Sequence, residues 1–368
     1  MSAPSPPPSL DPLRSASGRL LAWYDAHARA LPWRAPAGHW PDPWRVLVSE
    51  FMLQQTTVAT VATRFETFLA RFPTPRAMAE AGADAVLEAW SGLGYYRRAR
   101  HLHACAAALV ARHGGRVPAE ETALAALPGV GPYTAAAVAA IAFDRPTVPV
   151  DGNVARVLLR VLGLDWPLPG ALARLRRLAP ALAPPVRAGD HAQALIELGA
   201  LVCRPRAPAC PRCPLAGLCV ARAGGRTDEL PRRDPRPSRP VRRVRAWLAH
   251  DGAGRVLLRR RPPRGLLAGL VDVPSEPLRA GETGGGPPLA ADWRPLPGEV
   301  RHLFTHLELR VRLHLARVRA SPPPGRPPPE GVFWWPLARL EALPLATLGR
   351  RLLAHAGLLP SGRQASGR

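Results

Sequence analysis

The stretch that most constrains this chain is residues 124–151, where a short apolar run leads into the turn Leu-Pro-Gly-Val-Gly at 127–131 and then an alanine-rich segment. Proline just inside a helix start, with glycines before it, predicts that a helix begins near Pro132. Gly129 and Gly131 permit a tight turn whose backbone N–H groups, with the positive end of that helix, can bind a phosphate oxygen. Taken alone, such a turn also fits an ordinary corner between two helices.

The charge of the chain points to a polyanionic partner. Its 368 residues carry a net charge of +23, and all 50 basic residues are arginine. A large positive net charge is typical of proteins that bind nucleic acid. Because the sequence contains no lysine, no side chain offers a primary amine. No apolar run is long enough to span a bilayer, and the first residues are Pro- and Ser-rich rather than signal-like. We therefore expect a cytoplasmic monomer with no membrane partner.

The sequence predicts a tail, two domains and a linker. Residues 1–16 are expected to form a disordered tail, and helical periodicity predicts an all-helical domain over 17–225. A Gly-, Pro- and Arg-rich stretch at 226–240 predicts a linker. The hydrophobic period then changes to that of strands, so we expect an α+β domain over 241–360. The predicted helices of the first domain are 17–30, 44–56, 57–72, 84–90, 96–113, 153–162, 171–182 and 191–202, and the second domain has predicted strands at 241–249, 256–261 and 307–318 and a helix at 348–356.

Glu50 is a candidate general acid. It is the only ionisable residue between Arg45 and Arg64, and apolar side chains surround it on nearly every face of its helix. A carboxyl held there is partly desolvated, which raises its pKa and lets it keep a proton near neutral pH. Such a group can donate the proton to a leaving group, although a lone glutamate on a helix more often points into solvent.

Asp151 is a candidate for a carboxylate that stays ionised. It directly precedes the helix expected at 153–162, and as an N-cap it would accept backbone N–H bonds at the positive helix end. The sequence therefore predicts that Asp151 stays ionised when Glu50 does not, although capping alone would explain an aspartate here. Glycosidic cleavage needs two carboxyl groups in opposed environments: an acid for the leaving group and an anion for the oxocarbenium ion.

Four cysteines form a compact set in which six, two and five residues separate successive members. In a cytoplasmic protein disulfides are not expected. Four thiolates at this spacing suit zinc and an iron–sulfur cluster about equally. The fifth cysteine, Cys105, lies in an alanine-rich helix and is expected to be a buried apolar residue. The four are Cys203, Cys210, Cys213 and Cys219.

Three motifs together resemble a known superfamily. The turn at 127–131 and Val-Asp-Gly-Asn-Val at 150–154 are similar to those of the helix-hairpin-helix DNA glycosylases of the endonuclease III superfamily. Ser-Glu-Phe-Met-Leu-Gln-Gln-Thr at 49–56 resembles the catalytic helix of MutY-type adenine DNA glycosylases, with Phe51 where that family usually has valine. The resemblance covers roughly residues 20–358.

The resemblance implies roles for several residues. Glu50 would be the general acid, and Asp151 would both cap its helix and stabilise the positive sugar. The four cysteines would hold one [4Fe–4S] cluster, in a loop spanning 203–219. Tyr133 stands where bifunctional members of the superfamily carry a lysine that forms a Schiff base, and no lysine elsewhere could replace it. We therefore expect simple hydrolysis that leaves an abasic site.

The resemblance also assigns contacts with double-stranded DNA. The target adenosine must leave the base stack, because its glycosidic bond is inaccessible in a duplex. The matching residues are Leu31, Trp33, Arg34 and Tyr133 for the adenine pocket, Gln54 and Tyr95 for the wedge that enters the vacated stack, and Gly129 and Gly131 of the hairpin (124–135) for the backbone.

The second domain resembles the Nudix-like domain that is appended to MutY. Its Phe-Thr-His at 304–306 looks like the family's Phe-Ser-His element that reads 8-oxoguanine, which would make Thr305 and His306 lesion contacts, with Thr replacing the usual Ser. A working Nudix hydrolase needs a helix dense in glutamate to hold magnesium, and residues 274–300 have only scattered glutamates. The sequence therefore favours recognition over hydrolysis in this domain.

The function predicted from these features is that of an adenine DNA glycosylase of base excision repair, associated with the nucleoid through DNA. Its expected substrate is adenine mispaired with 8-oxoguanine or with guanine. The nearest alternative is an endonuclease III-type enzyme for oxidised pyrimidines, which the missing lysine and the additional domain argue against. A catalytically silent DNA-damage binder is a third possibility, which Glu50 and Asp151 argue against.

Overall fold

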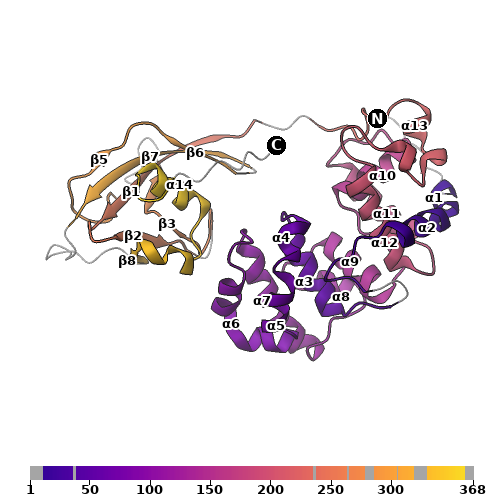
Figure 1. The fold of residues 1–368 in the computed structure, drawn as a ribbon, viewed down its shortest axis with the longest axis horizontal. Helices are drawn as coiled ribbons and strands as arrows, with labels where there is room; N and C mark the ends of the chain where they lie inside the picture. Colours follow the sequence, from indigo (N-terminus) through magenta and orange to yellow (C-terminus); the bar gives the residue numbers. More distant parts are fainter. Residues whose placement is uncertain are drawn as a thin grey trace, which may run out of the picture. The chain divides into compact units, whose positions relative to one another are not determined.

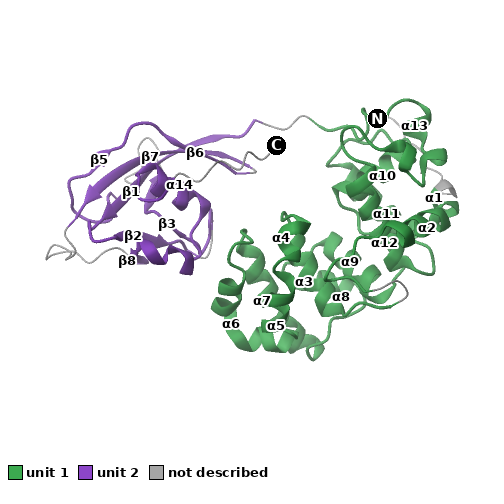
Figure 2. Ribbon diagram, viewed as in Figure 1, with its two compact units in different colours: residues 1–235 green, residues 236–368 purple. Residues whose placement is uncertain are grey.

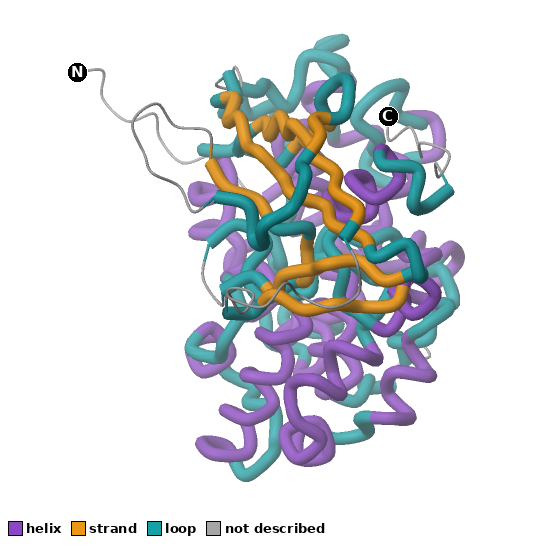
Figure 3. The backbone as a smooth tube through the Cα atoms, turned by 90° about the vertical axis from the view of Figure 1, so that its left-hand side faces the viewer, coloured by secondary structure: helices purple, strands orange, loops and turns teal. Residues whose placement is uncertain are grey.

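The computed structural model divides the chain into two compact units, residues 1–235 and 236–368 (Figure 2). In the described part of the chain the first unit is helical, and every strand lies in the second unit. Figure 3 draws the helices in purple and the strands in orange. None of the described helices is long and apolar enough to cross a membrane. The described residues are 11–35, 39–234, 238–262, 265–277, 286–304, 306–318 and 330–360.

Two clusters of buried apolar side chains hold the first unit together. One surrounds α3 (Pro43–Leu53) and α9 (Pro132–Phe143), and the other surrounds α10 (Gly152–Val161). The residues of α9 from 134 to 142 are all buried, and most are alanine. Small side chains let neighbouring helices approach closely: a Cβ added at Gly189 of α12 would lie 2.6 Å from the carbonyl oxygen of Ala140.

Local capping explains where the site-bearing helices begin. Asp42 caps α3 by accepting hydrogen bonds from the amides of Trp44 (2.7 Å) and Arg45 (3.2 Å), and Pro43 occupies the first turn, where its missing N–H costs nothing. The turn that joins α8 (Glu121–Ala125) to α9 has Gly131 as the N-cap and Pro132 in the first turn of α9, as the sequence predicts. The helices of the first unit are α1 (Asp11–Ser15), α2 (Ser17–His27), α3, α4 (Val58–Ala62), α5 (Phe65–Arg71), α6 (Pro75–Ala89), α7 (Arg97–His113), α8, α9, α10, α11 (Ala171–Leu182), α12 (Ala188–Glu197), η1 (Leu198–Val202, a π-helix), η2 (Cys210–Arg212), η3 (Ala216–Leu218) and α13 (Val220–Ala223) (Figure 1).

Two predicted boundaries of the first domain are corrected by the structure. Residues 11–15, assigned to a disordered tail, form α1, and the side chains of Leu13 and Ala16 join the second apolar cluster. Residues 226–234, assigned to the linker, pack against the helical unit. The amide of Leu168 donates to the carbonyl of Arg232 (2.8 Å), and Leu230 is buried. The hydrogen bonds here are between backbone groups, so a Gly-, Pro- and Arg-rich composition does not reveal them.

The second unit is built on one eight-stranded mixed sheet. Its central pair, β1 (Val241–His250) and β7 (Glu308–Arg317), is parallel and in register from Val241 opposite Glu308 to His250 opposite Arg317. Apolar side chains of both strands pack with α14 (Thr347–His355) into the core of this unit. The remaining elements are β2 (Arg255–Arg260), β3 (Val271–Asp272), β4 (Ser275–Pro277), β5 (Arg294–Pro295), β6 (Val300–Leu303), β8 (Val332–Pro336) and η4 (Leu337–Ala342).

Candidate active site

Glu50 lies on the last turns of α3 and is only 7% exposed. Burial raises the pKa of its carboxyl from 4.5 to about 7, and the negative charge of Asp151 adds to that rise. A hydrogen bond from Tyr133 and the positive charge of Arg34 lower the pKa in part. The structure thus brings together four of the predicted site residues, and Glu50 can hold a proton near neutral pH.

Tyr133 supports the Glu50 carboxyl directly. It lies in the first turn of α9, and its hydroxyl donates a hydrogen bond to Glu50. Burial, followed by the charges of Glu50 and Asp151, raises the pKa of Tyr133 well above 10. The phenol therefore stays protonated in the neutral range and acts as a hydrogen-bond donor. The position that would carry a lysine in a bifunctional enzyme is filled here by a neutral group.

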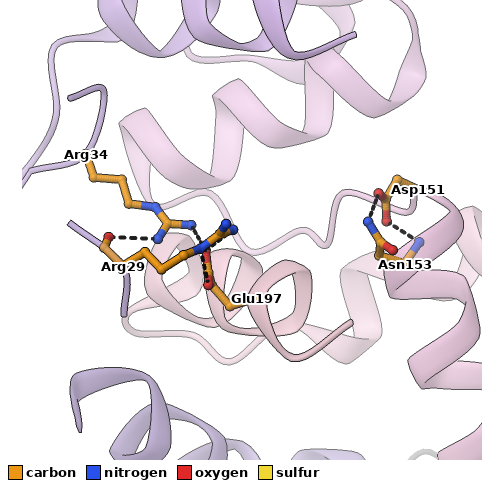
Figure 4. Close-up of polar contacts among 5 residues, drawn as sticks. All are labelled: Arg29, Arg34, Asp151, Asn153 and Glu197. Atoms are coloured by element: carbon orange, nitrogen blue, oxygen red, sulfur yellow. Dashed lines mark hydrogen bonds and ion pairs between the residues drawn. The ribbon is translucent and has the colours of Figure 1, made fainter. Parts of the chain in front are cut away.

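Asp151 caps α10 by accepting three hydrogen bonds, and Figure 4 shows the two that come from Asn153. One carboxylate oxygen accepts from the amides of Asn153 (2.8 Å) and Val154 (2.7 Å), and the other accepts from the Asn153 side chain (3.1 Å). These bonds lower the pKa of Asp151, yet burial outweighs them and the net shift is upward. The donors favour the ionised form, as the sequence analysis expects, and burial acts against them.

The segment before α3 supplies three predicted pocket residues. Leu31 and Arg34 are half-buried, and Trp33 is buried with its ring edge-on to Phe65 at 5.4 Å. Trp33 is therefore also a core residue of the first apolar cluster. Arg34 is held by an ion pair with Glu197 (2.7 Å), a residue that the sequence analysis did not single out.

The two predicted wedge residues lie on segments that one arginine joins. Arg98, buried on α7, donates to the carbonyl oxygens of Phe51 and Met52 at the end of α3 and to those of Leu93 and Gly94 just before Tyr95. Its guanidinium also lies 5.4 Å from the ring centroid of Tyr95. Tyr95 is 60% exposed in a left-handed conformation (φ 48°). Gln54 follows α3 as its C-cap. Arg98 was missed from sequence, where it is one arginine among many.

The two hairpin glycines have different physical explanations. Gly129 has φ +77°, and an added Cβ would lie 2.5 Å from the Cβ of His101. The fold itself therefore requires glycine at this position. Gly131 has an extended backbone, and an added Cβ would meet no atom within 4 Å. Among the described residues, no neighbouring atom therefore requires glycine there.

The four cysteines of the 203–219 loop line one cavity of about 380 Å³, including its open mouth, together with Arg160 and Arg222. Burial, and then the proximity of the other three thiols, raises the pKa of Cys213 to about 11. Within the described residues, no three His, Cys, Asp or Glu side chains are arranged to hold a metal ion. The donor set itself, four thiols around one cavity, has the chemistry that an iron–sulfur cluster requires.

Two arginines of α10 tie this loop to the helix that Asp151 caps. Arg156 donates to the carbonyl of Cys203 (2.7 Å) and to the side-chain oxygen of Asn153 (2.9 Å). Arg160 donates to the sulfur of Cys203 (3.3 Å) and to the carbonyl of Arg204 (2.7 Å). The loop is therefore fixed to α10 by charged side chains as well as by apolar packing.

In the second unit, Thr305 lies outside the described residues. His306 is exposed, and its ring centroid lies 6.3 Å from that of Phe304. Two of the scattered glutamates in 274–300 pair with arginines: Glu276 with Arg245 (3.7 Å) and Glu299 with Arg312 (3.2 Å). Each of these two carboxylates is thus paired with a cation, and Glu282 lies outside the described residues.

Comparison with known proteins agrees with this geometry. Residues 48–180 match the HhH-GPD superfamily of base excision DNA repair proteins, and residues 245–355 match the NUDIX domain. The adenine DNA glycosylase of Homo sapiens is 37% identical over 380 residues, which cover 86% of this chain and 69% of the human protein. The chain belongs to the adenine DNA glycosylase family.

Further relatives support the same placement. The adenine DNA glycosylase of Mycolicibacterium smegmatis is 42% identical over 229 residues, or 62% of this chain and 77% of that protein. A solved structure of a thermostable thymine-DNA glycosylase aligns with a TM-score of 0.52 and 28% identity, over 58% of this chain and 98% of its own. The predicted fold, a helical glycosylase domain followed by a Nudix-like domain, is confirmed, and this member of the adenine DNA glycosylase family is a DNA N-glycosylase of base excision repair.

Proposed function

We propose that this glycosylase hydrolyses the N-glycosidic bond of adenine mispaired with 8-oxoguanine, and also with guanine, and leaves an abasic site. The observation that carries the proposal is the pair of carboxyls formed by Glu50, which is buried, and Asp151, which is half-buried. Glu50 has a pKa raised to about 7, and the charge of Asp151 acts on it. An acid that is protonated near pH 7, close to a second carboxylate, is the arrangement that glycoside cleavage uses.

In the proposed reaction, adenine is flipped out of the duplex and its N7 accepts the proton of Glu50. The bond between the base and the sugar then breaks, its electron pair leaves with adenine, and the sugar becomes an oxocarbenium ion. The carboxylate of Asp151 stabilises that cation electrostatically. Water adds to the cation and loses a proton, so the products are adenine and an abasic deoxyribose.

Tyr133 makes the proposed enzyme monofunctional. Lyase chemistry needs an amine that attacks the abasic aldehyde, and no side chain of this sequence carries a primary amine. Tyr133 instead donates a hydrogen bond to Glu50. Strand breaks should therefore appear only after alkali or heat.

The remaining site residues fit roles in binding the duplex. Gly131 is the N-cap of α9, and the free space at its Cβ position leaves room for a phosphate at the N-terminus of that helix. The exposed ring of Tyr95 suits insertion into the base stack. Gln54 would insert beside it, because Arg98 holds the segments that carry both residues through the carbonyl oxygens of Met52 and Gly94. Leu31, Trp33 and Arg34 line the adenine pocket.

We infer that Cys203, Cys210, Cys213 and Cys219 hold a [4Fe–4S] cluster, since their thiols line one cavity. Such a cluster couples metal binding to the folding of its loop. For the opposite strand, Thr305 and His306 would read the 8-oxoguanine edge, a role that the exposure of His306 permits.

A single-turnover assay tests the function. Purified protein would be incubated in excess with duplexes that contain A opposite 8-oxoguanine, A opposite guanine, or an oxidised pyrimidine, with and without borohydride. We expect adenine release from the first two, no cleavage of the third, and no trapped protein–DNA complex. Release of the oxidised pyrimidine with efficient trapping would instead assign the endonuclease III-type activity. The E50Q variant, which keeps the shape of the side chain, controls for contaminating glycosylases.

A further inference from the structure

Arg98 is a buried cation that joins two segments distant in sequence. It lies in the first turn of α7, and the residue is only 7% exposed. Burying a cation is costly unless hydrogen bonds satisfy it. Within the described residues, its guanidinium donates to four backbone carbonyl oxygens and one hydroxyl. The acceptors are Phe51 (3.1 Å) and Met52 (2.8 Å) for Nη1, and the Thr56 hydroxyl (2.9 Å), Leu93 (3.1 Å) and Gly94 (3.2 Å) for Nη2.

The two bonds from Nη1 cap the end of α3. The last four carbonyl groups of a helix have no partner within the helix, and α3 ends one residue after Met52. Arg98 satisfies the carbonyls of Phe51 and Met52 and places a positive charge at the negative end of the helix dipole. The same end of α3 carries Glu50 and leads into Gln54. Arg98 therefore fixes the point at which the catalytic helix passes into the proposed wedge.

Each segment that Arg98 joins contains a residue with a left-handed backbone. Gln55, in the turn after α3, has φ 59°, and Tyr95 has φ 48°. Residues other than glycine seldom adopt this conformation and keep it where the surrounding structure over-determines it. Arg98 bonds to the hydroxyl of Thr56, the residue after Gln55. It also bonds to the carbonyl of Gly94, the residue before Tyr95, so both turns are held beside their left-handed residues.

A second side chain holds the loop that carries Tyr95. The indole Nε1 of Trp90 donates to the carbonyl oxygen of Gly94 (3.1 Å). The Arg98 guanidinium lies 5.4 Å from the ring centroid of Trp90 and 5.4 Å from that of Tyr95. Trp90 is fully buried, whereas Tyr95 is exposed. The loop is thus fixed by buried groups and leaves one aromatic ring accessible.

We propose that Arg98 is a positioning residue for base extrusion: it holds the segments of Gln54 and Tyr95 as one rigid wedge that is formed before DNA binds. The inference rests on the proposed insertion of these two side chains into the base stack. A wedge that is already ordered loses little conformational entropy on binding, so more of the interaction free energy is left to open the duplex. Bond breaking belongs to Glu50 and Asp151 and should not need Arg98.

R98K separates these two steps. It keeps the positive charge but replaces a planar fork by a single ammonium, which cannot reproduce the bonds to both segments. With saturating enzyme, single-turnover release of adenine opposite 8-oxoguanine should slow about tenfold, which corresponds to about 1.4 kcal/mol. The slowing should shrink to less than about threefold when the base pairs on both sides of that adenine are mismatched, because unstacking then costs less. R112K, the same substitution at an exposed position of α7, is the matched control and should equal the parent on both duplexes.

A double-variant cycle tests whether Arg98 acts through the wedge. Y95A removes the ring that Arg98 positions, so R98K should slow Y95A by a smaller factor than it slows the parent. An R98K rate equal to that of the parent on the fully paired duplex would overturn the inference. Equal slowing of folded R98K on both duplexes, or equal slowing with and without Tyr95, would also overturn it.

Amide hydrogen exchange tests the preformed wedge without catalysis. The amides of Thr56 and Leu93 bond within the two segments and serve as reporters. In the parent without DNA they should already be protected, and in R98K they should exchange about tenfold faster. If R98K does not fold, the parent decides: reporter amides that become protected only when DNA binds would overturn the inference. A parent that binds DNA but releases no adenine would overturn the proposed function, while the exchange rates would still decide the role of Arg98.

Discussion

Replacing Glu50 by Gln should abolish base release and stabilise the folded protein, and the two effects have one physical cause. The pKa of the carboxyl rises from 4.5 in an unfolded chain to about 7 in the folded one. At roughly 1.4 kcal/mol per pH unit, ionising Glu50 therefore costs the folded state about 3 kcal/mol. Because the side chain is only 7% exposed, solvent screens little of this cost.

The sign follows from which state holds the extra proton. Between pH 4.5 and about 7, the folded protein keeps a proton on Glu50 that the unfolded chain has lost. The contribution of this group to the free energy of unfolding is therefore complete below 4.5 and is lost as pH rises through about 7. E50Q has no such dependence. The stability difference between E50Q and the parent should thus grow in favour of E50Q by about 3 kcal/mol from acidic to mildly basic pH.

Thermal unfolding of both proteins at about pH 5 and about pH 8 measures this change. For a unit of about 235 residues, 3 kcal/mol corresponds to a difference in Tm of roughly 6 to 12 °C. E80Q, which removes a carboxylate from an exposed position of α6, is the matched control for the loss of one acidic group. If the difference in Tm between E50Q and the parent is the same at both pH values, the claim that Glu50 is buried with a raised pKa is refuted.

Three further outcomes are expected. D151N should lose base release in the single-turnover assay yet stay within about 0.5 kcal/mol of the parent in urea unfolding, because asparagine caps a helix as well as aspartate does; a large loss of stability would contradict the capping geometry. C213S should lose the iron that co-purifies with the parent, measured by iron analysis and visible absorbance, and should bind DNA less tightly; a colourless parent with stoichiometric zinc would instead indicate a zinc site. Deletion of residues 242–368 should retain base excision but lower the rate ratio between 8-oxoguanine and guanine opposite adenine, and an unchanged ratio would remove the lesion-reading role from the second unit.

The sequence predicted elements well where periodicity and terminal signals coincide. The helix expected at 171–182 has the same bounds as α11, and the strand expected at 307–318 exceeds β7 by one residue at each end. The helix expected at 57–72 is two helices, α4 and α5, separated at Thr63 and Arg64. Neither residue is a helix breaker, so nothing local marked the division.

Short strands were missed because pairing, rather than local sequence, creates them. Residues 294–295 become β5 only because they bond to Leu315 and His314 of β7, and residues 332–336 become β8 against β2. A stretch of two to five residues has too few positions to show a period of two. These elements therefore needed the assembled sheet to be recognised.

Some residues of the candidate site could be recognised from local sequence, and others could not. Glu50, Asp151 and Tyr133 stand in local motifs, and the structure places them within reach of one another's charges. Glu197 and Arg98 have no local signature, because each acts on segments distant in sequence: the bonds from Arg98 reach back 46 and 47 residues to α3. Their importance is a property of the fold.

Glu50, which is buried, and Asp151, which is half-buried, are best understood as one titrating pair. Burial raises the pKa of both, and the charge of Asp151 raises that of Glu50 further. What distinguishes them is the number of donors: Asp151 accepts two amides and a side-chain N–H at the start of α10, whereas Glu50 accepts the Tyr133 hydroxyl. Since hydrogen bonds to the charged form favour ionisation, the first proton bound by the pair goes to Glu50 and the negative charge stays on Asp151.

The hydrogen bonds of the helix cap therefore determine which carboxyl is the acid and which is the anion. D151N should lower the pKa of Glu50, because it removes the negative charge that raises it. If the carboxyl resonance of Glu50 titrates at the same pH in D151N as in the parent, the two groups are not coupled and the assignment needs another cause.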